Sequence, residues 1–385
     1  MRKTAIGTAL ALPLVTLTAC ADAPKVEIVS DTVACREPGR YIGWPSAVCL
    51  KDGSVLAVFS GNRLEHCCPS GVVQAVRSTD MGRTWSAPLT IGDTPIDDRD
   101  AGVVQLPDGE ILVSWFTSVA YLQVPTWKAQ EKRGMTELSE HFGRWCVRSR
   151  DGGRTWTRPE KMSIKGSTPH GPIVARDGSL LNVGRYAPGL NGKDEALATN
   201  GTKTEICCER SRDGGRTWEM LCPKFPDTNN ENARPGIFHE PHVAELADGT
   251  LVALIRYHGG DDFLRQSVSR DGGRTWSPMR KSAICAGPSA MHLLALPGGR
   301  LVATYSRRIG GKGEGEFVAF SDDAGKTWTA SDACCIHRTV PGTAGGDIGY
   351  PATVRLKDGS FLSVFYEPER TGAKPVLMAT RWNLL

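Results

Sequence analysis

The octet SRDGGRTW occurs three times letter for letter, at Ser149–Trp156, Ser211–Trp218 and Ser269–Trp276. Two looser copies flank these, STDMGRTW from Ser78 and SDDAGKTW from Ser321. Ser and Asp side chains can bond backbone NH groups across a tight turn, glycine permits positive φ, and Thr and Trp begin a returning strand. The tryptophan then offers a large apolar surface to a neighbouring repeat. The octet therefore predicts a hairpin turn with a structural role.

A second repeat sets the number of structural units. Short turns between two strand patterns recur at Asp52-Gly53, Asp108-Gly109, Asp177-Gly178, Asp248-Gly249, Gly298-Gly299 and Asp358-Gly359. Six hairpins with five octets fit an all-β, six-bladed β-propeller, in which the short turn joins the first two strands of a blade and the octet joins the last two. In the last blade, the C-terminal VLMATRWNL would be the third strand and the N-terminal VEIV the fourth. The chain ends would then interrupt the turn where a sixth octet would stand, and no sheet edge would remain free.

Composition agrees with one domain of this kind. The chain has 385 residues, of which 40% are hydrophobic, so it can bury a sizeable core. We assign residues 26–385 to the propeller. The net charge is only +4, and no basic run with interleaved aromatic residues occurs, which disfavours a nucleic-acid partner.

The N-terminus has the pattern of a targeting segment. Arg2 and Lys3 precede an apolar stretch over residues 5–19, which is too short for an ordinary membrane-spanning helix. The LTAC that follows resembles the bacterial lipobox, which implies cleavage after residue 19 and lipid modification of Cys20. We expect residues 1–19 to be a signal peptide, residues 20–25 a short tether, and the protein to be lipid-anchored in the bacterial cell envelope, at the outer membrane or in the periplasm. The alternative is an ordinary secretion signal followed by an accidental cysteine.

Eleven further cysteines would then reside in an oxidising compartment, where disulfides persist. Three adjacent pairs occur, Cys67–Cys68, Cys207–Cys208 and Cys334–Cys335. We expect structural disulfides of unspecified pairing, with at least one thiol left over because the number is odd. No CxxC or CxxH spacing indicates a metal, and no cofactor is expected.

The spacing of the short turns predicts which residues share the face opposite those turns. A strand of about eight residues crosses a blade. Eight residues before the turns stand Trp44, Asp100, Pro169, Glu240, Ala290 and Tyr350. Eight residues after the turns stand Ser60, Phe116, Arg185, Arg256, Ser306 and Tyr366, with Arg307 and Arg308 following directly and with Arg63, Glu65 and His66 close to Ser60. Carboxylates, arginines and a tyrosine thus converge on one end of a central channel.

The octet closely resembles the Asp box of sialidases, and residues 26–385 resemble a bacterial exo-α-sialidase. GYPATVRLKDG is similar to the family's tyrosine strand and HEPHVAELADGTLVALIR to its glutamate-to-arginine stretch. The resemblance implies that Tyr350 is a nucleophile, that Glu240 is its base, and that Arg256 with Arg308 or Arg307 binds a substrate carboxylate. A phenol needs such a base because its pKa is near 10, and a neutral nucleophile avoids repulsion by an anionic sugar.

The chain departs from the family's pattern in two places. The position of the first clamp arginine holds Gly43, so Arg40 or Arg63 could replace it, while His66 and Arg185 could add further substrate contacts. The loop expected to carry the acid/base aspartate offers Glu65 but no Asp. Asp100 has the better register for the acid, and we favour it over Glu65.

These patterns predict a retaining glycosidase that removes terminal sialic acid, or a related acidic nonulosonic sugar, from glycans. Two alternatives remain at this point. One is a glycan-binding propeller without catalysis, which the altered clamp would suit. The other is a different carbohydrate-active hydrolase or lyase on the same fold, because a fold does not by itself fix function.

Overall fold

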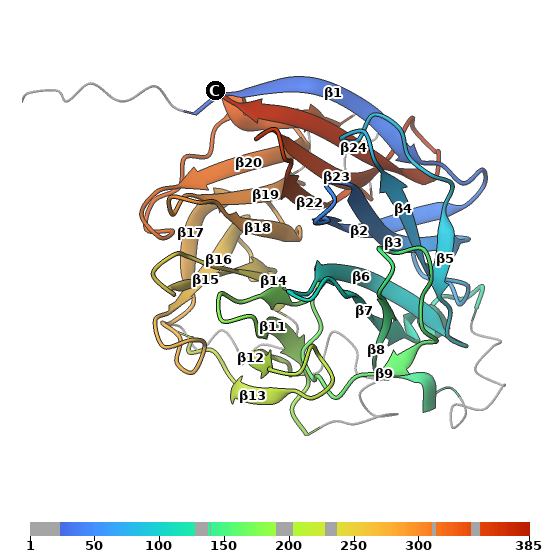
Figure 1. The fold of residues 1–385 in the computed structure, drawn as a ribbon, viewed down its shortest axis with the longest axis horizontal. Coiled ribbons are helices and arrows are strands. Elements are labelled where there is room, and N and C mark those ends of the chain that lie inside the picture. Colours follow the sequence, from blue (N-terminus) through green and yellow to red (C-terminus); the bar gives the residue numbers. More distant parts are fainter. Residues whose placement is uncertain are drawn as a thin grey trace, which may run out of the picture.

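A computed structural model describes residues 24–127, 138, 140–189, 203–227, 237–309, 313–339 and 347–385. Its strands form six four-stranded antiparallel sheets, arranged as blades around a central axis (Figure 1). The predicted all-β, six-bladed propeller is confirmed. None of the helical segments in the described ranges has the length and apolar character that a membrane crossing requires. The predicted signal peptide, Cys20 and most of the tether lie outside the described residues.

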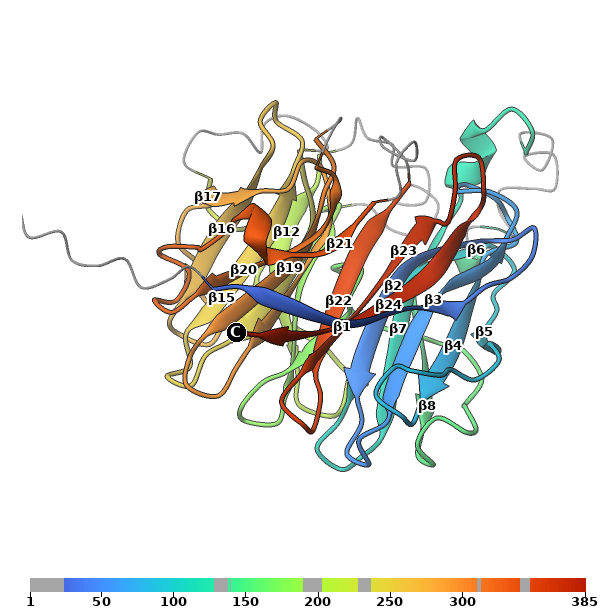
Figure 2. The ribbon, with the colours of Figure 1, turned by 90° about the horizontal axis from the view of Figure 1, so that it is seen from above.

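The first three blades follow one another along the chain. Blade 1 consists of β2 (Tyr41–Cys49), β3 (Val55–Arg63), β4 (Val72–Ser78) and β5 (Leu89–Gly92). Blade 2 consists of β6 (Asp97–Gln105), β7 (Ile111–Ser118), β8 (Arg144–Ser149) and β9 (Glu160–Lys161). Blade 3 consists of β10 (Ile173–Val174), β11 (Leu180–Tyr186), β12 (Glu205–Ser211) and β13 (Glu219–Cys222). A short 3₁₀ turn, η1 (Ala120–Gln123), stands above one face of the ring after β7 (Figure 2).

The remaining blades complete the ring. Blade 4 consists of β14 (Phe238–Glu245), β15 (Leu251–Tyr257), β16 (Phe263–Ser269) and β17 (Arg280–Cys285). Blade 5 consists of β18 (Met291–Ala295), β19 (Leu301–Arg307), β20 (Gly315–Ser321) and β21 (Cys335–Arg338), with the 3₁₀ turn η4 (Asp332–Cys334) before β21. Blade 6 consists of β22 (Gly349–Arg355), β23 (Phe361–Pro368), β24 (Pro375–Leu384) and β1 (Val26–Cys35).

Blade 6 joins the two ends of the described chain. Strand β1 pairs antiparallel with β24 from Val26–Leu384 to Cys35–Leu377, and the two strands lie side by side in Figures 1 and 2. The assignment of the C-terminal stretch as third strand and the N-terminal stretch as fourth strand is therefore confirmed. Closing the ring in this way gives the outer edge of β24 a partner.

Each octet forms a turn between the third and fourth strands of its blade, as predicted. In blade 3, Asp213 accepts hydrogen bonds from the Thr217 backbone and hydroxyl, at 2.9 and 2.6 Å, while Ser211 accepts one from the Gly215 NH at 2.7 Å. Gly214 and Gly215 both have positive φ. The expectation that all five octet tryptophans are largely buried is only partly right. Trp276 and Trp328 are buried, whereas Trp85, Trp156 and Trp218 are half-buried and pack against the apolar clusters between the blades.

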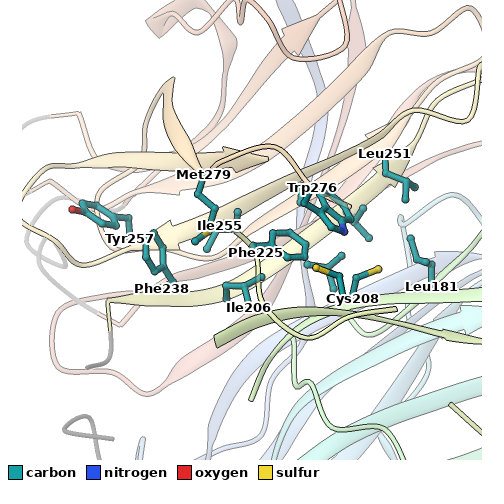
Figure 3. Packing of buried hydrophobic residues seen from close by; sticks show 14 of the residues in the cluster. Leu181, Ile206, Cys208, Phe225, Phe238, Leu251, Ile255, Tyr257, Trp276 and Met279 are labelled. Atoms are coloured by element: carbon teal, nitrogen blue, oxygen red, sulfur yellow. The ribbon is translucent and has the colours of Figure 1, made fainter. Parts of the chain in front are cut away.

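One apolar cluster fills each of the six interfaces between neighbouring blades. The second strand of a blade is buried almost throughout, as in β15, because its sheet packs against neighbours on both faces. Figure 3 shows the interface of blades 3 and 4, where Phe225 stacks on Trp276 with ring centroids 4.3 Å apart. These interfaces hold the inner strands at fixed positions around the axis.

The expectation of structural disulfides is not met, since all eleven described cysteines are free. The geometry of adjacent cysteines explains part of this result. Cys207 and Cys208 follow one another in β12, and successive residues of a strand point to opposite faces of the sheet. Cys208 packs in the cluster between blades 3 and 4, where it serves as a small apolar side chain.

Removing a large side chain at the closing blade should destabilise the whole ring. Trp382 is fully buried in the cluster between blades 5 and 6 and stacks on Phe361 with ring centroids 4.4 Å apart. We expect Trp382→Ala to lower the free energy of unfolding by about 3–5 kcal/mol, measured by urea denaturation. Leu385→Ala is the control, because Leu385 is 72% exposed and its truncation should change little. A loss below about 1 kcal/mol for Trp382→Ala would contradict this account of ring closure.

Candidate active site

Four residues at the same place in four blades have a left-handed backbone conformation. The φ angles are 53° at Trp44, 55° at Asp100, 46° at Glu240 and 53° at Tyr350. Each residue stands eight positions before the short turn of its blade, at a point where the pairing of the first two strands shifts. Positive φ is uncommon outside glycine, costs free energy and concentrates at functional sites. The bulges aim these side chains away from the regular alternation of the strand.

Three of these four residues open into one pocket of about 390 Å³ on the axis. Asp100 comes from blade 2, Glu240 from blade 4 and Tyr350 from blade 6. The other residues that line the pocket are His66, Arg99, Phe116, His239, Arg256, His258, Arg308 and Tyr366. Trp44 is buried instead, in an aromatic cluster that also contains Tyr350 and Tyr366. The predicted convergence of a tyrosine, carboxylates and arginines at one end of the channel is therefore what the structure has.

Tyr350, Glu240 and Arg256 form a hydrogen-bonded triad. The Tyr350 hydroxyl donates to Glu240 Oε1 at 2.5 Å, and Arg256 Nη1 donates to Glu240 Oε2 at 2.6 Å. Arg256 Nη1 also lies 3.2 Å from the Tyr350 oxygen and can donate to it. The phenol oxygen thus faces both a base that can take its proton and a cation that can stabilise a phenolate.

The electrostatics of the triad place the proton on the tyrosine at rest. Burial and the charge of Glu240 raise the pKa of Tyr350 well above its usual value of 10.0. Burial also raises the pKa of the Glu240 carboxyl, but the charge and hydrogen bond of Arg256 outweigh it, and the pKa falls to about 2. Glu240 is therefore ionised and Tyr350 neutral at physiological pH.

Asp100 has the opposite character from Glu240. Its carboxyl is 6% exposed, and Oδ1 has no hydrogen-bond partner within the described parts of the chain. Burial raises the pKa of Asp100 to about 7, because the charge of Glu240 adds to it and that of Arg99 only partly offsets it. The two carboxyls of the pocket therefore differ in their protonation near neutral pH, which is the pattern of an acid beside a base.

Arg308 is held in place by a polar network behind the pocket. Its Nη2 lies 3.4 Å from the Tyr366 hydroxyl, and Tyr366 donates to Asp347 Oδ1 at 2.6 Å. His66 Nδ1 lies 2.6 Å from Asp347 Oδ2, which also accepts a hydrogen bond from Tyr41. Asp347 thus connects three side chains around the pocket and fixes two of its lining residues, His66 and Tyr366.

Arg99 also lines the pocket, although the spacing of the short turns does not predict it. Its guanidinium carbon lies 4.1 Å from the centre of the Trp44 ring, and Nη2 is 3.4 Å from His66 Nε2. Regular strand alternation would turn Arg99 and Asp100 to opposite faces, but the bulge at Asp100 brings both into the pocket. Among the described residues, the arginines that line the pocket are therefore Arg99, Arg256 and Arg308.

Neither Arg63 nor Arg40, the two residues predicted to replace the first clamp arginine, lines the pocket. Arg63 is fully buried, forms an ion pair with Asp97 and donates to the His66 carbonyl at 2.7 Å, so it supports the loop instead of lining the pocket. Arg40 is absent from the pocket lining and lies in the turn before β2. Glu65 accepts a hydrogen bond from the Trp127 indole and does not line the pocket either.

Two further candidates lie elsewhere. Arg307 points away from the pocket, because it follows strand alternation beside Arg308 and pairs with Asp332 at 2.7 Å. Arg185 lines a different pocket, next to the first. In the described ranges, no group of three or more His, Cys, Asp or Glu side chains is arranged to hold a metal ion.

Comparison with known proteins assigns the family. Residues 103–363 match the BNR repeat-like domain, which is more than half of the chain. The chain belongs to this family. Two proteins named sialidase are similar to it, one from Bacteroides fragilis, 25% identical over 226 residues, and one from Clostridium perfringens, 25% identical over 256 residues. These matches cover 54% and 62% of the chain but only 37% and 60% of the two relatives.

Solved structures share the fold of this BNR repeat-like protein. A Dyadobacter fermentans protein of unknown function has a TM-score of 0.72 at 22% identity, covering 94% of this chain and all of that one. A Hadza microbial sialidase has a TM-score of 0.64 at 20% identity, covering 88% of this chain and 65% of that one. The intramolecular trans-sialidase from Ruminococcus gnavus has a TM-score of 0.60 at 13% identity, covering 93% and 96%. The protein is therefore a divergent, sialidase-like member of its family.

The raised pKa of Asp100 has a consequence for stability. A carboxyl whose folded pKa lies above its unfolded value contributes stability below the unfolded pKa of 3.8 and loses it as the pH rises through about 7. We expect Asp100→Asn to match the wild type near pH 4 and to exceed it at pH 8 by roughly 2–4 kcal/mol. Urea denaturation at the two pH values measures the difference. An Asp100→Asn protein that is no more stable than wild type at pH 8 would show that this carboxyl ionises without cost.

Proposed function

We propose that this protein is a retaining glycosidase that removes a terminal sialic acid, or a related acidic nonulosonic sugar, from glycans. The observation that carries the proposal is the 2.5 Å hydrogen bond from the Tyr350 hydroxyl to Glu240, inside a pocket that also holds Arg256. A tyrosine joined to an ionised base is a means of making a nucleophile from a neutral side chain. The fold and the distant relatives named sialidase support a sialidase-type glycosidase at the level of the family.

The charge of the pocket suits an anionic sugar. Among the residues that line the pocket, with Asp100 protonated, Arg99, Arg256 and Arg308 stand against one ionised carboxylate, that of Glu240. Behind the lining, Asp97 lies 4.0 Å from Arg99 and offsets part of its charge. Guanidinium groups bind a carboxylate through parallel, charge-assisted hydrogen bonds. In the proposed complex, Arg256 and Arg308 hold the carboxylate of the sugar, and Arg99 adds positive potential from the blade 2 side.

Substrate binding would also activate the base. The low pKa of Glu240 depends on Arg256, and a substrate carboxylate on Arg256 would offset part of that positive charge. Glu240 then becomes a stronger base at the moment when Tyr350 is needed. Because the charge of Arg256 also lowers the pKa of Tyr350, the same offset disfavours a free phenolate, so we expect the proton to pass to Glu240 as the oxygen attacks the sugar.

The reaction then follows in two displacements. The Tyr350 oxygen attacks the anomeric carbon while its proton passes to Glu240, the glycosidic carbon–oxygen bond breaks, and Asp100 donates its proton to the leaving oxygen. In the second step Asp100 accepts a proton from water, the water oxygen attacks the anomeric carbon, and the bond to Tyr350 breaks as Glu240 returns the proton. Two inversions give net retention. The substrate would be a sialylated or other acidic glycan. The proposed lipid anchor at Cys20 would hold the enzyme in the cell envelope, where it would meet such glycans.

Two other functions give different results in one experiment. A glycan-binding propeller without catalysis would bind sialosides and release nothing, whereas a hydrolase for uronic acids would release those sugars instead. The pairing of Tyr350 with Glu240 favours catalysis, since binding alone needs no buried phenol on an ionised base. A release assay across fluorogenic sialosides and uronides separates the three.

Replacing the nucleophile tests the mechanism directly. We expect Tyr350→Phe to fold normally and to lose turnover by about 100-fold or more, because one oxygen is removed with little change in packing. Intact mass spectrometry with a 2,3-difluorinated sialic acid should show a covalent adduct on wild type and none on the variant. Tyr305→Phe is the matched control, since Tyr305 is buried in the cluster between blades 4 and 5. Unchanged turnover in Tyr350→Phe would refute the mechanism.

The role of Asp100 as acid predicts a dependence on pH and on the leaving group. Since the acid must be protonated, kcat/KM should fall as the pH rises through about 7. Asp100→Asn should abolish that alkaline limb and should slow substrates with poor leaving groups far more than those with good ones. Glu65→Gln is the comparison, because Glu65 contacts Trp127 and not the pocket. A larger leaving-group effect in Glu65→Gln would assign the acid to Glu65.

A further inference from the structure

A second pocket adjoins the catalytic pocket. It has a volume of about 220 Å³ and lies between blades 2 and 3, where Phe116 lines both pockets. Two arginines, Arg144 and Arg185, contribute to it, and the described residues that line it include no Asp or Glu. This pocket thus concentrates positive charge beside the proposed reaction site.

The repeat explains why Arg185 lacks an acidic partner. Arg185 stands eight residues after the short turn of blade 3, as Arg256 does in blade 4. In blade 4 the residue eight before the turn is Glu240, which pairs with Arg256 at 2.6 Å. In blade 3 that place holds Pro169, which cannot form an ion pair. Among the described residues, the one hydrogen bond donated by the Arg185 guanidinium runs from Nε to the Thr204 hydroxyl, at 3.0 Å.

The backbone of Arg185 is held by hydrogen bonds, and neighbouring arginines disfavour the charged form of its guanidinium. Its backbone bonds to Ser167 in both directions at 2.9 Å and pairs with Ile206 on β12. Burial lowers the pKa of its guanidinium, and the charges of Arg144 and Arg256 lower it further, against an opposing effect of Glu240. A partly buried cation in this state gains from an incoming anion, and a fork of donors fits a carboxylate or a sulfate.

The position of the second pocket relates it to the leaving group. Phe116 is on β7, and its register partner on β6 is Arg99, the neighbour of Asp100. Since Asp100 is the proposed donor to the leaving oxygen, the part of the substrate that departs would pass along this wall. The face of the Phe116 ring could receive the apolar face of a sugar there.

We propose that the second pocket binds an anionic group on the leaving sugar, a carboxylate or a sulfate ester, with Arg185 as the residue that recognises it. This inference rests on the proposed function, because it names the substrate class of the same site. The preferred substrate is then a glycan with negative charge on both sides of the scissile bond.

Kinetics with matched substrates test the proposal. We would measure kcat/KM for 3′-sialyllactose, the same trisaccharide sulfated on its galactose, and α2,8-linked disialic acid. Wild type should prefer at least one charged leaving sugar by about tenfold or more. Arg185→Met should remove that preference and leave 3′-sialyllactose within about twofold, and Arg185→Lys should fall between. Equal rates on all three substrates with wild type, or an equal loss on all three in Arg185→Met, would overturn the proposal.

A control variant and a binding measurement complete the test. Arg212→Met is the control variant, because it removes the same charge from the octet turn of the same blade, where the Arg212 side chain is 63% exposed. This variant should keep the wild-type preference for a charged leaving sugar. Calorimetry with galactose 6-sulfate, glucuronic acid and galactose requires no turnover. If the wild type binds a charged sugar and Arg185→Met does not, the second pocket is supported, whether or not any sialoside is cleaved. If no sialoside is cleaved, only the proposed function is refuted. No binding of either charged sugar to the wild type would refute the pocket.

Discussion

The pairing of β1 with β24 is the interaction on which the rest of this structure depends. It joins two segments from opposite ends of the described chain and completes blade 6, and blade 6 carries Tyr350. The pocket needs blades 2, 4 and 6 at fixed places around one axis, since each of them supplies one of its central side chains, Asp100, Glu240 and Tyr350. A ring open at this point would leave blade 6 free to move relative to blade 1. The six apolar clusters pack each blade against its neighbours, so the closed ring forms a rigid frame of six blades.

The frame stabilises backbone geometry that the inner strands would not adopt alone. Positive φ at four non-glycine residues costs free energy, and it persists because strand pairing on either side and packing between blades leave no alternative. In return for this cost in free energy, the side chains of these residues point where a regular strand would not direct them. Three of the bulges turn Asp100, Glu240 and Tyr350 into the pocket, and at Asp100 the bulge also brings Arg99 there. Repetition of one distortion in several blades thus assembles a site from residues that are far apart in the chain.

Charge then distinguishes side chains that the repeat places alike. Arg256 and Arg185 occupy equivalent positions in neighbouring blades, but only Arg256 has a carboxylate opposite it. Pairing with Arg256 keeps Glu240 ionised, whereas burial without a bonded partner at Oδ1 keeps the Asp100 carboxyl protonated up to about pH 7. The same fold therefore provides a base, an acid and an unpaired cation within adjoining pockets.

The sequence by itself determined the number of blades, the shared last blade and the face on which Asp100, Glu240 and Tyr350 lie. These features depend on local turn chemistry and on the fixed rise of a strand, both of which can be read from spacing.

Only the tertiary structure decided which arginines reach the pocket. Arg63 had a suitable position, but a buried ion pair with Asp97, distant in the chain, directs it elsewhere. Arg99 was not predicted, because the spacing from the turn selects Asp100 alone in its strand and the bulge brings the neighbouring residue into the pocket as well. The proline that follows Trp44, Glu240 and Tyr350 could have indicated bulges in three blades, since proline inside a sheet favours such sites, but no proline follows Asp100. The choice of partner for Arg63 depends on a segment distant in the chain, and the bulge at Asp100 lies in the pairing of β6 with β7 without a proline to mark it, so no local pattern encodes either feature.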